Sequence, residues 1–417
     1  MTSRRVVVTG IGALTPIGNN VQDYWNALSN GVSGAGPITR FDASKFKTRF
    51  ACEVKGFDVN NYIDRKEARR MDPYTQYAMV TAEEAIKNSG LDLEKINKDR
   101  AAVIWASGIG GLTSFTNEVS AYAKGDGTPR FSPFFIPMMI ADIASGLISI
   151  KYGFRGPNFA VVSACASSTN AISDAYLYIK VGKADLAITG GSEASVTEPA
   201  IGGFNSMKAL SERNDDPKTA SRPYDLDREG FVLGEGAGAL ILEELEHAKA
   251  RGAKIYAELV GIGASGDAYH MTAPHPDGYG AALVMRSAME EAGIKPSEVQ
   301  YINTHGTSTP IGDPQEIKAI QTVFGEDAYQ LNISSTKSMT GHLLGGAGAI
   351  EAIACLMAME TGIIPPTINH FTDDPAIDAR LNLTFNTAQK RDVKVALSNT
   401  FGFGGHNASV LFRKYEG

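Results

Sequence analysis

The sequence predicts an α/β fold built from two similar halves, residues 1–251 and residues 252–417. Short apolar runs of strand type alternate with helical segments, which is typical of βαβ units and mostly parallel sheets. The order of elements in residues 5–243 recurs in residues 255–413. Because two such units are fused, we expect pseudo-twofold symmetry and functional residues beyond the carboxyl ends of the strands.

The first half is organised around residues 158–191, whose pattern is strand, tight turn, helix and strand. An apolar run at 159–162 leads into a turn that carries Cys165, and small and capping residues from Ser167 onward begin a helix. The other elements expected in this half are strands 5–10, 101–106, 184–189 and 237–243 and a helix at 77–89.

The second half repeats this order. A strand at 331–335 and a helix at 347–360 match the cysteine unit, and a glycine loop at 402–405 precedes the last strand. The other expected elements are strands 255–261, 299–304 and 408–413 and a helix at 286–292.

Composition excludes several classes of protein. The net charge of −7 argues against a nucleic-acid partner, and three cysteines without metal-ligand spacing predict a reducing compartment. We find no signal peptide and no apolar run of membrane-spanning length, so we expect a cytoplasmic protein with no membrane partner.

The turn 10–12 resembles part of a dinucleotide fingerprint, but Pro16 interrupts the helix that would bind phosphate, so we expect no cofactor.

Cys165 is the first candidate for chemistry. It lies on a strand-to-helix turn where helix amides point at its sulfur, and a helix N-terminus favours the nucleophilic thiolate. Ala164 and Ala166 leave room for a substrate carbonyl. The alternative, an inert buried cysteine, is less favoured on such a turn.

Two histidines occupy matching positions in the second half. His305 and His342 follow predicted strands, and Lys337 precedes His342 in the same loop. Cysteine can take an acyl group from a thioester, and two neutral imidazoles can donate to the enolate formed when a malonyl thioester loses CO₂. A single Cys–His pair with an orienting group would instead indicate a hydrolase. The spacing alone leaves both chemistries open.

Four ordered motifs resolve this choice: SACASSTNA, THGTSTPIGD, KSMTGHLLGGAGAIEA and NTFGFGGHN. They resemble those of the β-ketoacyl-acyl carrier protein synthases, over nearly the whole chain. The resemblance implies the thiolase-like fold with five layers, αβαβα. It also implies decarboxylative Claisen condensation of a malonyl carrier with a Cys-bound acyl chain. The Cys–His–His set is similar to the elongating, type II-like branch.

The resemblance also implies the roles of the site residues. Cys165 would be acylated, His305 and His342 would promote loss of CO₂, and Lys337 would tune the charge beside His342. The backbone amides of Cys165 and Phe403 would form the oxyanion hole, and Phe403 would gate the acyl tunnel. The remaining implied residues are Thr307 and Thr309 for the pantetheine arm, Ile109, Phe134 and Phe204 for the acyl pocket, Glu351 as a structural acid, and Asn303, Glu351 and Ser398 around a monovalent cation.

Acyl carrier protein is the implied partner, and Lys66, Arg69 and Arg70 are the expected docking residues. Their i, i+3 and i+4 spacing predicts one helix face, which Arg130 and Lys208 would extend. The family also implies a homodimer through the apolar strand at 159–162. Phe134 or Phe135 would then reach the neighbour's acyl pocket.

Three alternatives remain beside this interpretation. A polyketide-type ketosynthase would share the chemistry, although the length of the chain and the KSMTGH form favour fatty acid synthesis. A chain-length-factor-like subunit would lack the nucleophile, which is present here as Cys165. A thiolase would carry a second catalytic cysteine, whereas Cys355 lies inside a predicted helix.

Overall fold

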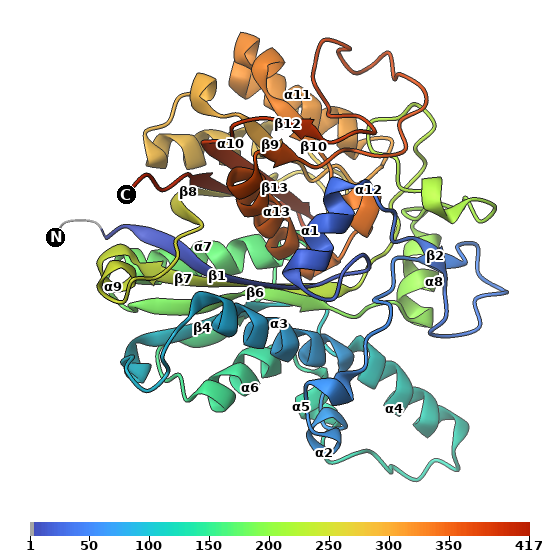
Figure 1. The fold of residues 1–417 in the computed structure, drawn as a ribbon. Coiled ribbons are helices and arrows are strands. Elements are labelled where there is room, and N and C mark those ends of the chain that lie inside the picture. The colour runs from blue at the N-terminus through green and yellow to red at the C-terminus, as the bar shows by residue number, and fades with distance from the viewer. Residues whose placement is uncertain (1–3) are drawn as a thin grey trace.

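The computed structural model describes residues 4–417. The large strands form one continuous sheet, in which five strands of the first half meet five of the second half where β1 pairs with β8 (Figure 1). The strands of the first half, in spatial order, are β5 (Asn158–Val161), β4 (Ala101–Ala106), β6 (Leu186–Glu193), β7 (Gly236–Glu244) and β1 (Val6–Leu14). Those of the second half are β10 (Asn332–Ser334), β9 (Tyr301–Asn303), β13 (Val395–Gly402), β14 (His406–Arg413) and β8 (Ala257–Gly266).

The spatial order confirms the duplication. In each half the central strands run parallel, as β4 does to β5 and β6, while the strands nearest the junction are antiparallel. Crossover helices make this parallel pairing possible. One strand of the second half, β13, is absent from the order predicted from the sequence; it matches β6 and completes the repeat.

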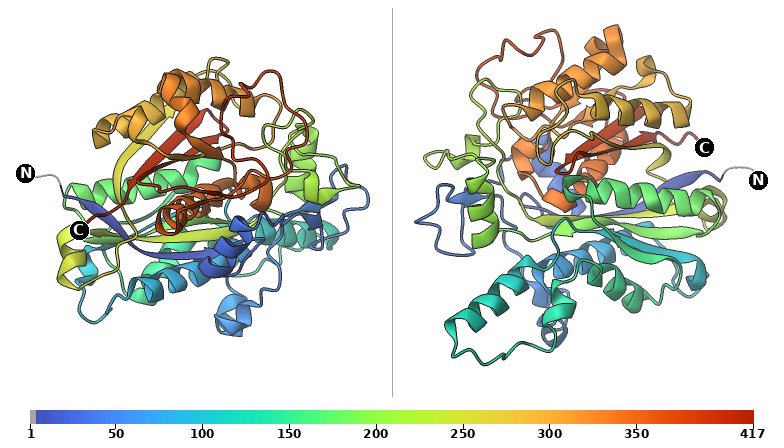
Figure 2. Two further views of the ribbon diagram at one scale, coloured as in Figure 1. Left: turned by 45° about the horizontal axis from the view of Figure 1, so that its top comes forward. Right: turned by 180° about the vertical axis from the view of Figure 1, so that it is seen from behind.

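Helices form three layers around the two halves of the sheet (Figure 2). On the outer face of the first half lie α3 (Pro73–Ser89) and α6 (Ile143–Tyr152). Between the halves lie α7 (Ser167–Lys180) and α13 (Ala347–Thr361), and α10 (Tyr279–Ala292) covers the second half with α11 (Gly312–Phe324) packed on it. This arrangement confirms the predicted five layers.

The central layer explains the composition of α13. Residues Leu344–Thr361 form a helical stretch that is long and apolar enough to cross a bilayer, with a mean hydropathy of 1.3. The expectation that no apolar run reaches this length is therefore wrong. However, 89% of the stretch is buried inside the protein, where α13 contacts β7, β13 and α7. A helix that is apolar all round is suited to such a buried layer.

Local signals fix the ends of the outer helices. The carboxylate of Asp72 accepts a hydrogen bond from the N–H of Tyr74 and caps α3, which ends at Gly90 in the left-handed region. The remaining α-helices and strands are α1 (Val21–Ser29), α2 (Arg65–Ala68), α4 (Leu112–Lys124), α5 (Phe135–Met139), α8 (Glu198–Ser206), α9 (Leu245–Ala250), α12 (Lys337–Thr340), β2 (Gly36–Pro37), β3 (Phe50–Ala51), β11 (Ile363–Ile364) and β12 (Gln389–Lys390). The domain boundary between residues 251 and 252 falls between α9 and β8 and stays a prediction.

Candidate active site

Cys165 lies in a short 3₁₀ turn, Ala164–Ala166, between β5 and α7. Ala164 has φ of 49°, in the left-handed region, and Ser167 braces the turn by donating from its hydroxyl to the carbonyl of Ala164 at 2.6 Å. Gly402 lies directly against this turn, because a Cβ there would be 3.0 Å from the nitrogen of Cys165. The turn therefore delivers the sulfur to the N-terminal end of α7, as the sequence predicts.

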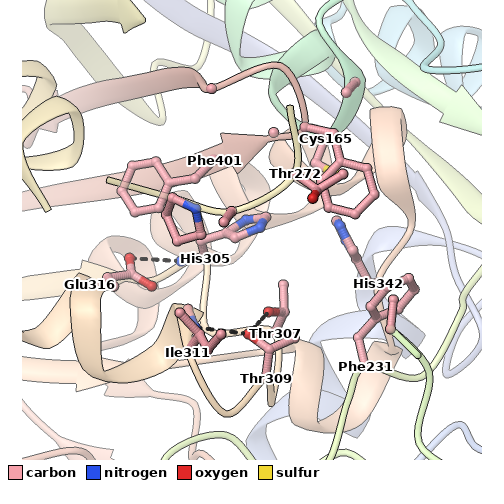
Figure 3. A pocket seen from close by; sticks show the side chains of 18 of the residues that line it. Cys165, Phe231, Thr272, His305, Thr307, Thr309, Ile311, Glu316, His342 and Phe401 are labelled. Atoms are coloured by element: carbon pink, nitrogen blue, oxygen red, sulfur yellow. Dashed lines mark hydrogen bonds between the residues drawn. The ribbon is translucent and has the colours of Figure 1, made fainter. Parts of the chain in front are cut away.

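A cavity of about 400 Å³ joins the two halves at this point. Cys165, His305 and His342 all line it, and their side chains converge from three different loops (Figure 3). The imidazole rings of His305 and His342 meet edge to face, with centroids 5.2 Å apart. The structure thus brings together the three residues that the motifs single out.

Each histidine is held by its backbone. The N–H groups of His305 and Gly306 donate to the carboxylate of Glu316 at 2.9 and 2.8 Å, and the N–H of His342 donates to the carbonyl of Val232 at 2.8 Å. Burial lowers the pKa of both imidazoles well below the usual value, and the positive charge of Lys337 lowers it further. Both rings are therefore neutral at physiological pH, so that a ring N–H can donate without carrying charge.

Lys337 is an interior residue, only 1% exposed, and it forms a buried ion pair with Glu351. Removing either partner would leave an uncompensated charge in the core. The charge of Lys337 also lies close enough to lower the pKa of both imidazoles.

Burial at Cys165 opposes the thiolate that the helix N-terminus is expected to favour. Burial raises the pKa of the Cys165 thiol to about 12, because desolvation outweighs the charge of Lys337 and a hydrogen bond from the backbone of Phe403. Because Cys165 is only 8% exposed, the thiol is protonated before substrate binds, and it requires a base to take its proton.

Thr307 and Thr309 line the same cavity, with their hydroxyl oxygens 3.2 Å apart. Between them Ser308 has φ of 70°, and the carboxylate of Asp313 accepts from its N–H at 3.1 Å. This loop places two adjacent hydroxyls on the cavity wall, where they can bind a polar arm of a substrate.

The structure places two of the three predicted acyl-pocket residues at the cavity and the third elsewhere. Ile109 and Phe204 line the cavity, as does Phe403, but Phe134 does not. The ring of Phe134 lies at the surface beneath the guanidinium of Arg70, 4.7 Å from its centroid. Its assignment to a neighbour's pocket stays a prediction.

Sequence reasoning missed four further residues of the site. Phe401 packs against the ring of His305 with centroids 5.7 Å apart, and Phe231 meets His342 at 5.4 Å. Thr272 comes from a loop of the second half that has no distinctive pattern. Glu316 lies on α11, a helix that was not predicted from the sequence, eleven positions after His305.

The basic cluster differs from its predicted form. The helix α2 covers only Arg65–Ala68, so Arg69 and Arg70 lie in the turn that follows. The prediction that Lys66, Arg69 and Arg70 share one helix face is therefore wrong. Lys66, Arg69 and Arg70 are nevertheless exposed on one short segment. The other two predicted docking residues are exposed as well, Arg130 beside Asp126 and Lys208 after α8.

Three buried oxygens coincide with the residues predicted to surround a monovalent cation. Asn303 and Ser398 face each other across β9 and β13, and Glu351 lies on α13, which packs against both strands. Their atoms Asn303 Oδ1, Ser398 Oγ and Glu351 Oε2 are buried without a hydrogen-bond partner among residues 4–417. Hard oxygen donors of this kind suit an alkali or alkaline-earth cation.

Comparison with known proteins agrees with this geometry. The family profile described as "Beta-ketoacyl synthase, N-terminal domain" matches residues 3–248, and "Beta-ketoacyl synthase, C-terminal domain" matches residues 256–371. The chain is 51% identical over 415 residues to 3-oxoacyl-[acyl-carrier-protein] synthase 2 of Staphylococcus aureus, covering 99% of both chains. It is 52% identical to the protein of the same name from Synechocystis, covering 100% of this chain and 99% of the relative.

A solved structure gives the same result for the fold. A type II polyketide ketosynthase in complex with its acyl-carrier protein superimposes with a TM-score of 0.91 at 35% identity, covering all of both chains. The family profiles and the full-length relatives establish that this chain belongs to the β-ketoacyl synthase family.

Proposed function

We propose that this protein is a β-ketoacyl-acyl carrier protein synthase II, which extends a fatty acyl chain by two carbons. The observation that carries the proposal is the single cavity that holds Cys165 with two neutral imidazoles, His305 and His342. In the first step the sulfur of Cys165 attacks the thioester carbonyl of an acyl carrier. A neutral imidazole takes the thiol proton, and the carrier leaves as its free thiol.

The second step uses the histidines as donors. A malonyl carrier loses CO₂, and the electron pair of the broken carbon–carbon bond forms an enolate whose oxygen accepts from the ring N–H groups of His305 and His342. The resulting carbanion attacks the acyl carbonyl on Cys165, and the backbone N–H groups of Cys165 and Phe403 stabilise the tetrahedral oxyanion. The sulfur of Cys165 then leaves as a thiolate and takes up a proton from water, and the β-ketoacyl carrier is released.

The other residues support these steps. Lys337 keeps the imidazoles neutral through its charge, and Glu351 compensates that charge in the core. Thr307 and Thr309 donate to the pantetheine arm, Phe403 gates the tunnel, and Ile109 and Phe204 line the acyl pocket. Incubation with an acyl carrier and a malonyl carrier should give the β-ketoacyl carrier by mass spectrometry, with an acyl adduct on Cys165; free acid as the only product would indicate a hydrolase instead.

A polyketide-type ketosynthase is the second candidate, and the 35% identical polyketide ketosynthase supports it. The higher identity to 3-oxoacyl-[acyl-carrier-protein] synthase 2 favours fatty acid synthesis. Single extension of one primer would support fatty acid synthesis, whereas repeated extension without reduction would support the polyketide function.

The carrier docks on the basic cluster of Lys66, Arg69 and Arg70, extended by Arg130 and Lys208. These side chains are exposed, and opposite charge on an acidic carrier would raise the association rate. Charge reversal at Arg69 and Arg70 should raise KM for carrier-bound substrate and leave small pantetheine thioesters unaffected. Equal losses on both substrates would assign the cluster to folding.

The active enzyme is a homodimer that pairs β5 across a twofold axis. β5 is an edge strand of the large sheet, and apolar side chains beside it are exposed, Val162 at 60% and Val181 at 61%. Phe134 or Phe135 then reaches the neighbour's acyl pocket. Sedimentation of the active species as a monomer would contradict this proposal.

A monovalent cation is coordinated by the oxygens of Asn303, Glu351 and Ser398, which have no hydrogen-bond partner among residues 4–417. Thermal unfolding should shift to higher temperature when potassium or sodium replaces choline at equal ionic strength, and no shift would exclude the site.

We place the enzyme in the cytoplasm, and its recovery in a membrane fraction would contradict this.

A further inference from the structure

The proposed mechanism leaves one buried carboxylate unused. Glu193 is the last residue of β6 and is fully buried, with 0% of its surface exposed. It lies behind the wall of the active-site cavity, near enough for its charge to affect the pKa of Cys165. A buried carboxylate is costly, so its hydrogen bonds need an explanation.

Glu193 accepts hydrogen bonds from two segments that are far apart in sequence. Its Oε2 accepts from the N–H of Gly108 at 2.8 Å and from the N–H of Gly345 at 3.0 Å. Its Oε1 accepts from the hydroxyl of Ser107 at 3.1 Å and from the N–H of Ile109 at 3.3 Å. The turn 107–109 follows β4 in the first half, whereas Gly345 precedes α13 in the second.

These segments form a wall of the cavity. Gly108, Ile109 and Leu344 line it beside Cys165. Gly108 and Ile109 donate to Glu193 themselves, and Leu344 precedes the donor Gly345. The two segments also touch directly, because a Cβ on Gly345 would lie 2.1 Å from the nitrogen of Gly108. One carboxylate therefore fixes wall residues from both halves relative to the nucleophile.

The charge of this group depends on the same donors. Burial raises the pKa of Glu193 to about 7, and the N–H groups of Gly108 and Gly345 are the largest effects that oppose this rise. With the hydroxyl of Ser195, which donates to Oε1 at 3.3 Å, the carboxylate accepts from five donors, whereas an amide in its place would direct an NH₂ group at one of them. A glutamine at this position fills the space but does not satisfy the donors.

We propose that Glu193 is a positioning residue that sets which acyl chains the cavity accepts, by holding Ile109 and Leu344 in a fixed place beside Cys165. The proposal rests on the proposed function, since it concerns the acyl chain carried by that cysteine. Glu193 touches no reacting atom. Its effect is on the shape of the wall that a long primer must pass or displace.

The test is a competition between hexanoyl and hexadecanoyl carriers for the wild type and Glu193→Gln. The ratio of the two kcat/KM values should change by at least about fivefold, the effect of losing one ordinary hydrogen bond. Malonyl decarboxylation, which depends on His305 and His342, should change by less than about twofold. Glu53→Gln is the matched control, because Glu53 is 5% exposed and accepts from the N–H of Thr39 at 2.9 Å, but does not line the cavity.

A milder variant keeps the test decisive if Glu193→Gln does not fold. Ser107→Ala removes one hydroxyl donor to Glu193 and should change the same ratio in the same direction, by about twofold. An unchanged ratio in both folded variants, or equal losses on both primers together with decarboxylation, would overturn the proposal. Failure of the wild type to form any β-ketoacyl product would instead reject the proposed function.

Discussion

The two halves build the same turn at the start of a central helix and use it differently. In the first half Ala164 has φ of 49°, and Cys165 follows it at the N-terminal end of α7. In the second half Leu344 has φ of 47°, and Gly345 follows it at the N-terminal end of α13. The same backbone conformation thus places Cys165 at the cavity in one half and packs Gly345 tightly against Gly108 in the other.

The groups that face the two turns differ in the same way. Gly402, the last residue of β13, lies against the Cys165 turn, whereas Glu193, the last residue of the matching strand β6, accepts from the N–H of Gly345. The proposed mechanism uses the amide of the first turn as a donor to the oxyanion, and Cys165 in that turn lines the cavity. The second turn donates its amide to a carboxylate of the protein itself. The two equivalent turns therefore differ in whether their amide is already bound within the protein.

The largest expected effect comes from removing the nucleophile. Cys165→Ala should abolish condensation, because no acyl chain can then be held on the enzyme. Malonyl decarboxylation should survive, since both histidines lie in the other half. Assays of β-ketoacyl product and of released CO₂ separate the two steps. Loss of both activities together would mean that the halves do not divide the chemistry as the comparison indicates.

Removing either histidine should produce the complementary defect. His305→Ala and His342→Ala should each slow malonyl decarboxylation by about a hundredfold or more, because each removes one donor to the enolate. Cys165 should still accept an acyl group, at least partly, as the mass of the intact enzyme would reveal. Decarboxylation near the wild-type rate in either variant would assign that histidine a structural role.

The sequence predicted the duplicated α/β architecture and the residues that meet in the cavity because both follow from local patterns. It did not predict β13, and the expectation of a mostly parallel sheet is wrong, because the strands from β6 through the junction to β13 pair antiparallel. The alternation of strands and helices, and the motifs around Cys165, His305 and His342, are all readable along the chain. Properties that depend on burial were not readable. The helix-terminal position of Cys165 favoured a thiolate, but the surrounding apolar residues reverse the direction of its pKa shift.

Residues that act across the two halves escaped the sequence in the same way. Glu193 and Glu316 each bind backbone amides that only the folded chain brings to them. The basic segment around Arg69 shows a further limit, since i, i+4 spacing identifies a helix face only where the helix continues, and α2 ends at Ala68.

The protonation state of Cys165 can be measured directly. Because its pKa is raised, the thiol is neutral at physiological pH, and the thiolate fraction should rise about tenfold for each pH unit. The rate of alkylation at Cys165 by iodoacetamide should therefore still be rising between about pH 7 and about pH 9, whereas a free cysteine derivative begins to level off at its ordinary pKa near about 8.5. A plateau for Cys165 near neutrality would show that the helix terminus outweighs burial.

The smallest expected effect concerns the closed turn. Gly345→Ala adds a methyl group that would lie 2.1 Å from the nitrogen of Gly108, so the segments that contain Gly108 and Gly345 must move apart. We expect a loss of about 2 kcal/mol in the free energy of unfolding, within the usual range for overpacking, from urea titration. Gly146→Ala is the matched control, because a Cβ at this site in α6 has no neighbour within 4 Å and alanine favours a helix. Equal stability of the two variants would mean that the second turn has room for a side chain, and that its closure does not distinguish the two halves.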